Sequence, residues 1–174
     1  MYQQMIFVNL PVNDLDASKK FFTELGYSIN PRFSDEKAAS VVISDTIVAM
    51  LLTKPFYATF TKKEIADATT TSEVLIALSA ESREKVDELV DKAIAAGGTA
   101  SGATQDHGFM YGRAFDDLDG HTWRSSGWTR PRSRLTPAVA SSEPGRAQTS
   151  RRVMDRQSQR PLTAYALTLL TERL

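Results

Sequence analysis

The alternation of hydrophobic and polar positions over the first 53 residues predicts a strand, a helix and three further strands. The opening segment is short and rich in β-forming residues, which is typical of a strand. Apolar residues then recur at helical spacing between Asp14, an expected N-cap, and Gly26, an expected stop. The predicted elements are a strand at 5–12, a helix at 14–26, and strands at 27–34, 39–44 and 46–53.

The same order of elements is predicted a second time, after a polar, Thr-rich connection at residues 54–71. A short helix is expected within that connection. The clearest helix of the chain follows in the second unit, with one apolar face and Gly97-Gly98 as its stop. The predictions are a short helix near 61–67, a strand at 72–79, a helix at 82–96, strands at 99–104 and 110–116, and a last strand from about 121. Two tandem β-α-β-β-β modules therefore predict an α+β fold, because a repeated element order is an architectural signal.

Charge divides the chain at Trp123. Residues 1–123 hold 11 Lys and Arg against 18 Asp and Glu, whereas residues 124–174 hold 10 Arg, no Lys and 3 acids. Residues 1–123 thus carry a net charge of −7 and residues 124–174 a net charge of +7. The overall net charge of zero is their sum and describes neither part. The predicted organisation is a first module at 1–53, a connection at 54–71, a second module at 72–128 with a disrupted last strand, and a basic, irregular tail at 129–174.

Composition also limits the classes of protein. The chain has no cysteine, which excludes disulfides and thiolate metal sites. No apolar run reaches the roughly 18 residues of a membrane span, and the N-terminal residues lack the pattern of a signal peptide. We therefore expect a cytoplasmic protein with no membrane partner. The acidic first part argues against nucleic acid as a partner, although the Arg-rich tail permits contact with phosphates.

Three motifs resemble the vicinal oxygen chelate superfamily, which includes glyoxalase I, bleomycin resistance proteins and extradiol dioxygenases. Residues 8–26 are similar to the family's opening strand and helix, which end in an aromatic pair and Leu-Gly. Residues 115–123 resemble its closing Asp-Pro-Asp-Gly-His turn, with Leu118 in place of Pro. Residues 106–113 resemble the penultimate strand of a bacterial glyoxalase-like subgroup. The resemblance covers about residues 5–123 and implies that the paired modules form a curved, cup-like mixed sheet.

The resemblance also implies where metal ligands would stand, namely on the first and last strand of each module. Those positions hold Phe7, Met50 (or a neighbour such as Leu52), Leu75 and Arg124, none of which is the usual His or Glu. A shift by two residues brings in Asn9 and Glu73, and two such positions do not make a divalent metal site. The two histidines, His107 and His121, are predicted in a loop and a turn. We therefore expect no metal and no other cofactor.

The expected site is a cup that binds a small, partly apolar molecule, as in the family's resistance proteins, which act mainly as homodimers and sequester a drug. The alternative is a glyoxalase-like lyase or isomerase that uses acid–base chemistry in the same cup; its catalytic residues are unknown. Asp116, Asp117 and Asp119 are interpreted as turn formers rather than catalytic acids. The predicted ligand-binding residues are Phe7, Asn9, Met50, His107, Phe109, Tyr111, Arg113 and Trp123.

Two hypotheses address the tail. The first is that the tail is disordered and basic, with a short helix near 162–174. Such a tail could contact nucleic acid, but we disfavour that role. We favour the other hypothesis, a frame-shifted reading of a GC-rich gene. The codons of residues 126–130, read from their third bases, permit Trp-Met-Asp-Pro with Asp forced, which resembles the ending of the glyoxalase-like subgroup. Arg124 then stands where that family carries its terminal Glu.

Overall fold

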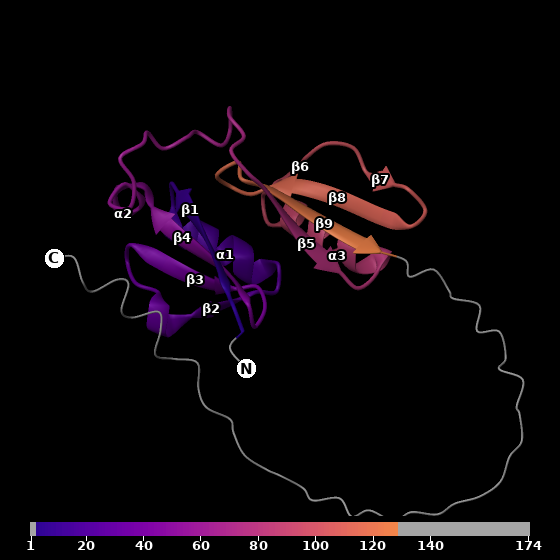
Figure 1. The fold of residues 1–174 in the computed structure, drawn as a ribbon, viewed down its shortest axis with the longest axis horizontal. Coiled ribbons are helices and arrows are strands. Elements are labelled where there is room, and N and C mark those ends of the chain that lie inside the picture. The colour runs from indigo at the N-terminus through magenta and orange to yellow at the C-terminus, as the bar shows by residue number, and fades with distance from the viewer. Residues whose placement is uncertain (1–2, 129–174) are drawn as a thin grey trace, which may run out of the picture. The chain divides into compact units, whose positions relative to one another are not determined.

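The computed structural model describes residues 3–128, while residues 1–2 and 129–174 lie outside the description. The described chain forms two successive modules, each a strand and a helix followed by further strands (Figure 1). The first contains β1 (Ile6–Val12), α1 (Leu15–Glu24), β2 (Ser28–Asn30), the 3-10 turn η1 (Pro31–Phe33), β3 (Ala38–Val42) and β4 (Ile47–Thr53). After α2 (Lys54–Tyr57), the second contains β5 (Leu75–Ala80), α3 (Arg83–Ala95), β6 (Thr99–Ala100), β7 (Gln105–Asp106), β8 (Met110–Asp116) and β9 (Thr122–Trp128).

Each module forms its own sheet with the same strand order. The first sheet runs β1-β4-β3-β2 and the second β5-β9-β8-β6, with β7 paired to β8. In both sheets the first strand pairs in parallel with the last, and the remaining described pairs are antiparallel. The predicted α+β class with two tandem modules is therefore confirmed. Both sheets use the same pairing pattern, and the same order of strands and helix along the chain produces it twice. The repeat can therefore be recognised from the order of elements.

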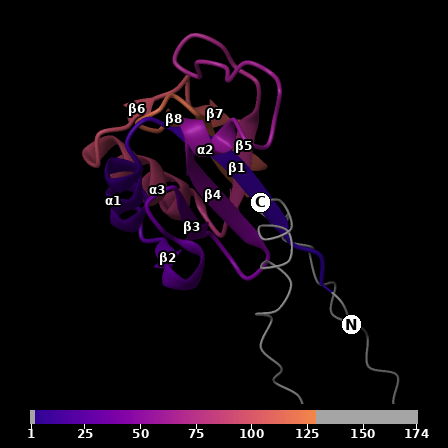
Figure 2. The same ribbon diagram turned by 90° about the vertical axis from the view of Figure 1, so that its left-hand side faces the viewer.

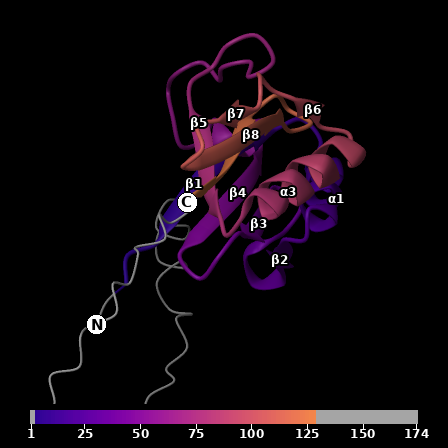
Figure 3. The same ribbon diagram turned by 90° about the vertical axis from the view of Figure 1, so that its right-hand side faces the viewer.

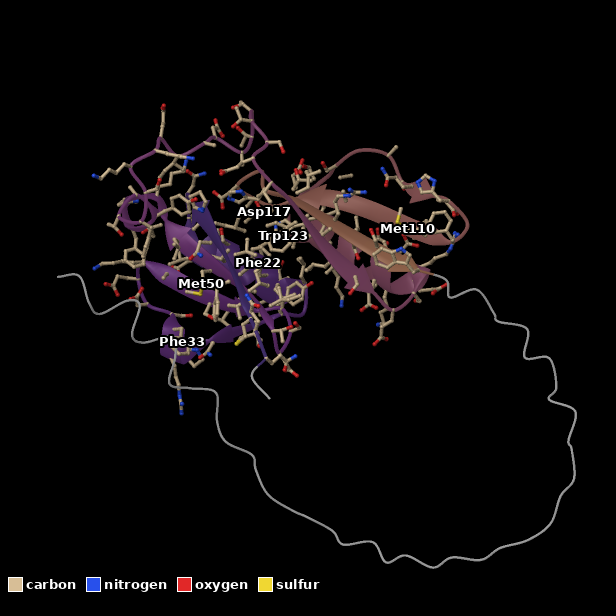
Figure 4. The ribbon with its side chains drawn as sticks, viewed as in Figure 1. Phe22, Phe33, Met50, Met110, Asp117 and Trp123 are labelled. Carbon is tan, nitrogen blue, oxygen red and sulfur yellow. The ribbon has the colours of Figure 1, made fainter. Side chains whose placement is uncertain are left out.

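Both long helices lie on the same side of the strands, as the two side views show (Figures 2 and 3). Their apolar faces, and the strand residues that face them, form one core cluster that spans both modules. Phe22 on α1 packs edge-on against Trp123 on β9, with ring centroids 5.3 Å apart (Figure 4). The ring centroids of Phe21 and Phe115 lie 6.2 Å apart. The side of each sheet that faces away from α1 and α3 is called the open face below. No helix among residues 3–128 is long and apolar enough to span a membrane.

The ends of the two helices follow from the local sequence, and the predicted N-cap Asp14 and the predicted stops at Gly26 and Gly97 are confirmed. The Asp14 carboxylate accepts a hydrogen bond from the Ala17 amide at 2.9 Å, and Ser82 caps α3 in the same way. Gly26 and Gly97 follow the helices with φ of 102° and 105°, a left-handed conformation in which a side chain is strained.

Some predicted elements were wrong. The helix expected near 61–67 is not formed; the helix of the connection is Lys54–Tyr57, where Pro55 stands in the first turn, a position that lacks an intrahelical donor anyway. The strand expected at 27–34 ends at Asn30, because Pro31 opens a 3-10 turn that Asn30 caps. The strand expected at 99–104 is only two residues long, and β7 was missed.

The last strand is intact, contrary to the prediction that it is disrupted. Residues 122–128 pair with β8 along their whole length, and residues 122–127 pair with β5. Backbone pairing does not depend on the side chains that a family member would carry there. Small residues also suit the position, since a Cβ on Gly127 would lie 3.1 Å from the Ser82 carbonyl oxygen. The predicted irregular tail, its helix and all but the start of the proposed frame shift fall outside the described residues, so the frame shift remains a prediction.

Ser125 on β9 is a local inconsistency in this core. It is 1% exposed, and its hydroxyl has no hydrogen-bond partner among the described residues. A buried polar group without a partner costs about 1–3 kcal/mol. We therefore expect Ser125→Ala to raise the free energy of unfolding by about 1 kcal/mol in urea denaturation.

Ser126→Ala is the matched control for that substitution, because Ser126 is the next residue on β9 and points to the other face. Its hydroxyl is not among the buried groups without a partner. We expect no gain in stability from Ser126→Ala. A gain of equal size in both variants would show that the effect comes from strand propensity and not from the orphan hydroxyl of Ser125.

Candidate functional site

The first sheet brings three of the predicted site residues to its open face. Side chains alternate along a strand, and Leu10 and Leu51 point toward α1 and the core. Phe7, Asn9 and Met50 therefore point the other way. Asn9 and Met50 are direct partners in the parallel register of β1 and β4. The register therefore brings these three residues to one face of the first sheet, and their role in ligand binding stays a prediction.

The second sheet contradicts the prediction for Tyr111, Arg113 and Trp123. Trp123 is 2% exposed in the core that faces the helices, and its register partner Phe115 is equally buried. Tyr111 and Arg113 have the same parity on β8 as Phe115, so they also lie on the helix side. The prediction assigned the wrong face because it placed these residues from the motif and did not count alternation from the buried Phe115.

Ion pairs with α3 confirm the helix-side placement. The Tyr111 hydroxyl donates a hydrogen bond to Asp87 at 2.8 Å, and Arg113 Nη1 donates to Asp87 at 2.8 Å and to Asp91 at 2.9 Å. The bond from Arg113 keeps the pKa of Asp87 below its usual range, and the bond to Asp87 raises the pKa of the Tyr111 phenol. Arg113 is thus engaged with two acidic side chains of α3.

His107 and Phe109 lie away from the other predicted site residues. They occupy the turn between β7 and β8, where the His107 amide bonds the Met110 carbonyl. Their rings stack with centroids 6.1 Å apart, and Phe109 is 62% exposed. This turn precedes β8 at Met110, whereas the closing turn of the module follows β8 at Asp116, at the opposite end of the strand.

A cleft of about 460 Å³ lies at the closing-turn end of the molecule. Its walls are the second half of β1, the connection between the modules, and the start of β9. The lining comprises residues 8–11, much of the segment from Tyr57 to Val74, and residues 120–122. Asn9 is the one predicted site residue that lines this cleft. The side chains of Lys63, Glu64, Glu73 and His121 belong to lining residues, so the walls are partly charged.

The closing turn fixes one module to the other. Asp119 is 8% exposed, and its Oδ1 accepts hydrogen bonds from the backbone and side-chain nitrogens of Asn13, both at 2.7 Å. Its Oδ2 accepts from the Ser18 hydroxyl at 3.1 Å. Asn13 directly precedes the N-cap of α1 and Ser18 lies near the start of that helix, whereas Asp119 belongs to the second module. Asp119 therefore connects the modules and has no free carboxylate oxygen for catalysis.

Asp117 organises the same turn internally. Its Oδ1 accepts from the amides of Asp119 and His121, both at 3.0 Å, and its Oδ2 accepts from Trp123 Nε1 at 3.0 Å. Burial raises the pKa of the Asp117 carboxyl. The His121 ring nitrogen Nε2 lies 2.9 Å from the Pro11 carbonyl oxygen, which assigns that nitrogen the donor role. These bonds support the interpretation of the Asp cluster as a turn former.

A divalent metal of the family's kind does not fit the residues present. Phe7 and Met50 lie on the open face of the first sheet, and Leu75 and Arg124 lie on the open face of the second. None of these four side chains is a carboxylate or an imidazole. Within residues 3–128, no three His, Asp or Glu side chains come together in a cluster able to hold a metal ion.

Arg124 and Thr122 are open-face residues that the predicted site omitted. Both have the parity opposite to Trp123 on β9. Alternation along β9 could have found them only if Trp123, which was predicted to bind the ligand, had been assigned to the core. The connection, which supplies much of the cleft lining, carries no periodic pattern that could have identified it.

Comparison with known proteins places the chain among relatives of the same fold. A family model described as bleomycin resistance protein-like N-terminal matches residues 4–44. A solved structure of a hypothetical protein from S. aureus is 31% identical, with a TM-score of 0.61, over 73% of this chain and 94% of that chain. No curated protein matches the chain.

Two further solved structures share the fold at lower identity. A glyoxalase/bleomycin resistance protein/dioxygenase family enzyme from Burkholderia phytofirmans PsJN is 19% identical, with a TM-score of 0.61, over 73% of this chain and all of that chain. A genomically encoded fosfomycin resistance protein from Listeria monocytogenes is 19% identical, with a TM-score of 0.54, over 74% of this chain and 96% of that chain.

Proposed function

Because the chain belongs to the vicinal oxygen chelate superfamily, among the glyoxalase and bleomycin resistance proteins, we propose that it binds a small, partly apolar molecule without a resident metal. The observation that carries this proposal is the cleft of about 460 Å³ at the end of the open face. Its volume lies within the usual range of small-molecule sites, about 300–1,000 Å³.

The cleft and the open face share residues, which supports a single binding region. Asn9 lines the cleft and is the register partner of Met50. Thr122 lines the cleft and stands two residues before Arg124 on the same face of β9. An apolar part of a ligand would lie on Phe7, Met50 and Leu75, whose burial drives binding, while polar groups in the cleft fix its orientation.

The second candidate is a lyase or isomerase that works by acid–base chemistry in the same cleft. The observation that favours it is that two carboxylates, Glu64 and Glu73, and the imidazole of His121 belong to one lining. General acid–base catalysis needs such groups within reach of one bound molecule. The bond of His121 to Pro11 weakens this candidate, because it already occupies one ring nitrogen.

The test uses Nile red, a neutral apolar dye, with protein treated with EDTA. We expect saturable binding that EDTA does not change, and at least a tenfold loss of affinity in Asn9→Trp, which fills the cleft. Ser28→Trp is the control, because Ser28 is an exposed strand residue outside the cleft lining. Dye binding that is the same in both variants would contradict the proposed site.

A parallel assay separates the two candidates. Turnover of the hemithioacetal of methylglyoxal and glutathione, lost in His121→Gln or Glu73→Gln, would support the lyase and contradict simple sequestration.

We also propose a homodimer, because Ile6 at the start of β1 is 54% exposed. Ile6 points to the face opposite to Phe7, so a second copy can cover it without occupying the proposed ligand site.

A further inference from the structure

Arg124 is a half-buried cation on the open face of the second sheet, and residues 3–128 offer it no carboxylate partner. Its Nη2 donates a hydrogen bond to the neutral side chain of Gln105 at 2.9 Å, and no acidic group among the described residues lies within 4.0 Å of it. A guanidinium carries five N–H donors. Most of the donors of Arg124 therefore have no partner in the part of the chain that the structure describes.

Two other arginines of the second module show how this chain normally pairs such a group. Arg83 forms two bonds of 2.6 Å to the Asp106 carboxylate, and Arg113 bonds both Asp87 and Asp91. Both lie on the helix side, since Arg83 also stacks on the Tyr111 ring. In the described part of the chain, the open-face arginine of this module bonds a neutral side chain instead.

The strand neighbours of Arg124 have short side chains. Its register partners are Ala77 on β5 and Ala114 on β8, and neither side chain is long enough to cover it. Asp116 shares the open face, but its Oδ1 accepts the Thr122 hydroxyl at 2.6 Å. An incoming oxyanion thus meets a cation that is flanked by small side chains and that no residue between 3 and 128 neutralises by a direct ion pair.

We propose that the bound molecule carries an oxyanion, a carboxylate or a phosphonate, next to an apolar body, and that Arg124 binds this anionic group. The proposal rests on the proposed function and specifies its ligand class. The planar fork of a guanidinium matches a carboxylate or phosphonate with two parallel hydrogen bonds. Leu75, on the same face of the adjacent strand β5, supplies apolar surface for the remainder of the molecule.

The experiment compares benzoate with benzamide, which have the same ring and nearly the same shape but differ in charge. Affinities are measured by ligand-observed NMR titration of the full chain, with phenylphosphonate as a second anion. We expect benzoate and phenylphosphonate to bind at least tenfold more tightly than benzamide. In Arg124→Gln that difference disappears, and in Arg124→Lys part of it remains because the charge is kept without the fork.

Arg83→Gln is the control variant, because it makes the same chemical change on the helix side and should keep the preference for the anion. Circular dichroism and the unfolding midpoint verify that each variant is folded. Equal binding of benzoate and benzamide to the native chain would overturn the anion inference and leave the proposed function standing. An anion preference that survives in Arg124→Gln would overturn the assignment to Arg124, and binding of neither probe would overturn both proposals.

Discussion

Trp123→Ala is expected to lower the free energy of unfolding by about 4 kcal/mol, the range observed when a large aromatic side chain is removed from a core. Trp123 is 2% exposed and packs on Phe22 across the two modules. Its indole N–H also donates to the buried Asp117 carboxylate. The substitution therefore leaves a cavity and removes one hydrogen-bond donor from a buried acid. Urea denaturation followed by circular dichroism measures the loss.

Trp128→Ala is the matched control, since Trp128 is the other tryptophan of the chain and stands on the same strand. It is 54% exposed, so its removal is expected to change the free energy of unfolding by about 0.5 kcal/mol or less. Equal losses in the two variants would contradict the core placement of Trp123. A Trp123→Ala variant of native stability that no longer binds Nile red would return Trp123 to the ligand site.

The sequence predicts the architecture well because the strongest signals are local. Asp14 and Ser82 lie at helix starts, where their side chains accept hydrogen bonds from backbone amides of the first turn. Gly26 and Gly97 follow the helix ends, where the backbone adopts a positive φ that favours glycine. The repeat of strand, helix and strands then follows from element order alone. The expected homodimer and cytoplasmic location stay predictions.

The faces of the last strands were harder to predict, because both faces of the second sheet carry large side chains. Met110 and Trp128 point one way, while Tyr111 and Phe115 point the other. An apolar–polar alternation that would separate a core face from an open face is therefore weak here. On the helix side, moreover, Arg113 finds its partners Asp87 and Asp91 on α3, and a pairing 22 to 26 residues apart is invisible in a local pattern.

The cleft could not be predicted for a different reason. Its lining comes from three segments that are far apart in sequence, and the connection contributes residues through irregular backbone without periodicity. Gly120 shows how closely these segments meet. A Cβ at this position would lie 2.8 Å from the backbone of Ala68, and the residue adopts a φ of 89°. The sequence suggested a turn glycine there, but not that the connection packs against it.

Asp119→Ala is expected to lower the free energy of unfolding by about 3 kcal/mol, because three donors lose a charged acceptor in a buried position. These donors are the two nitrogens of Asn13 and the hydroxyl of Ser18, which stand more than 100 residues away in sequence. Hydrogen bonds to charged groups are each worth about 1.5–3 kcal/mol, and donors left without a partner add a penalty. Guanidinium chloride denaturation measures the difference.

Asp116→Ala tests whether the position of the carboxylate matters more than its charge. Asp116 is three residues earlier, half-buried, and bonded to Thr122 at its own turn, so a loss of about 1 kcal/mol or less is expected.

A double-mutant cycle then isolates the contact between modules. Asn13→Ala combined with Asp119→Ala should lose less than the sum of the single variants, by about 1 kcal/mol or more. Strict additivity would mean that Asp119 stabilises only its own turn, and that the core around Phe22 and Trp123 alone joins the modules.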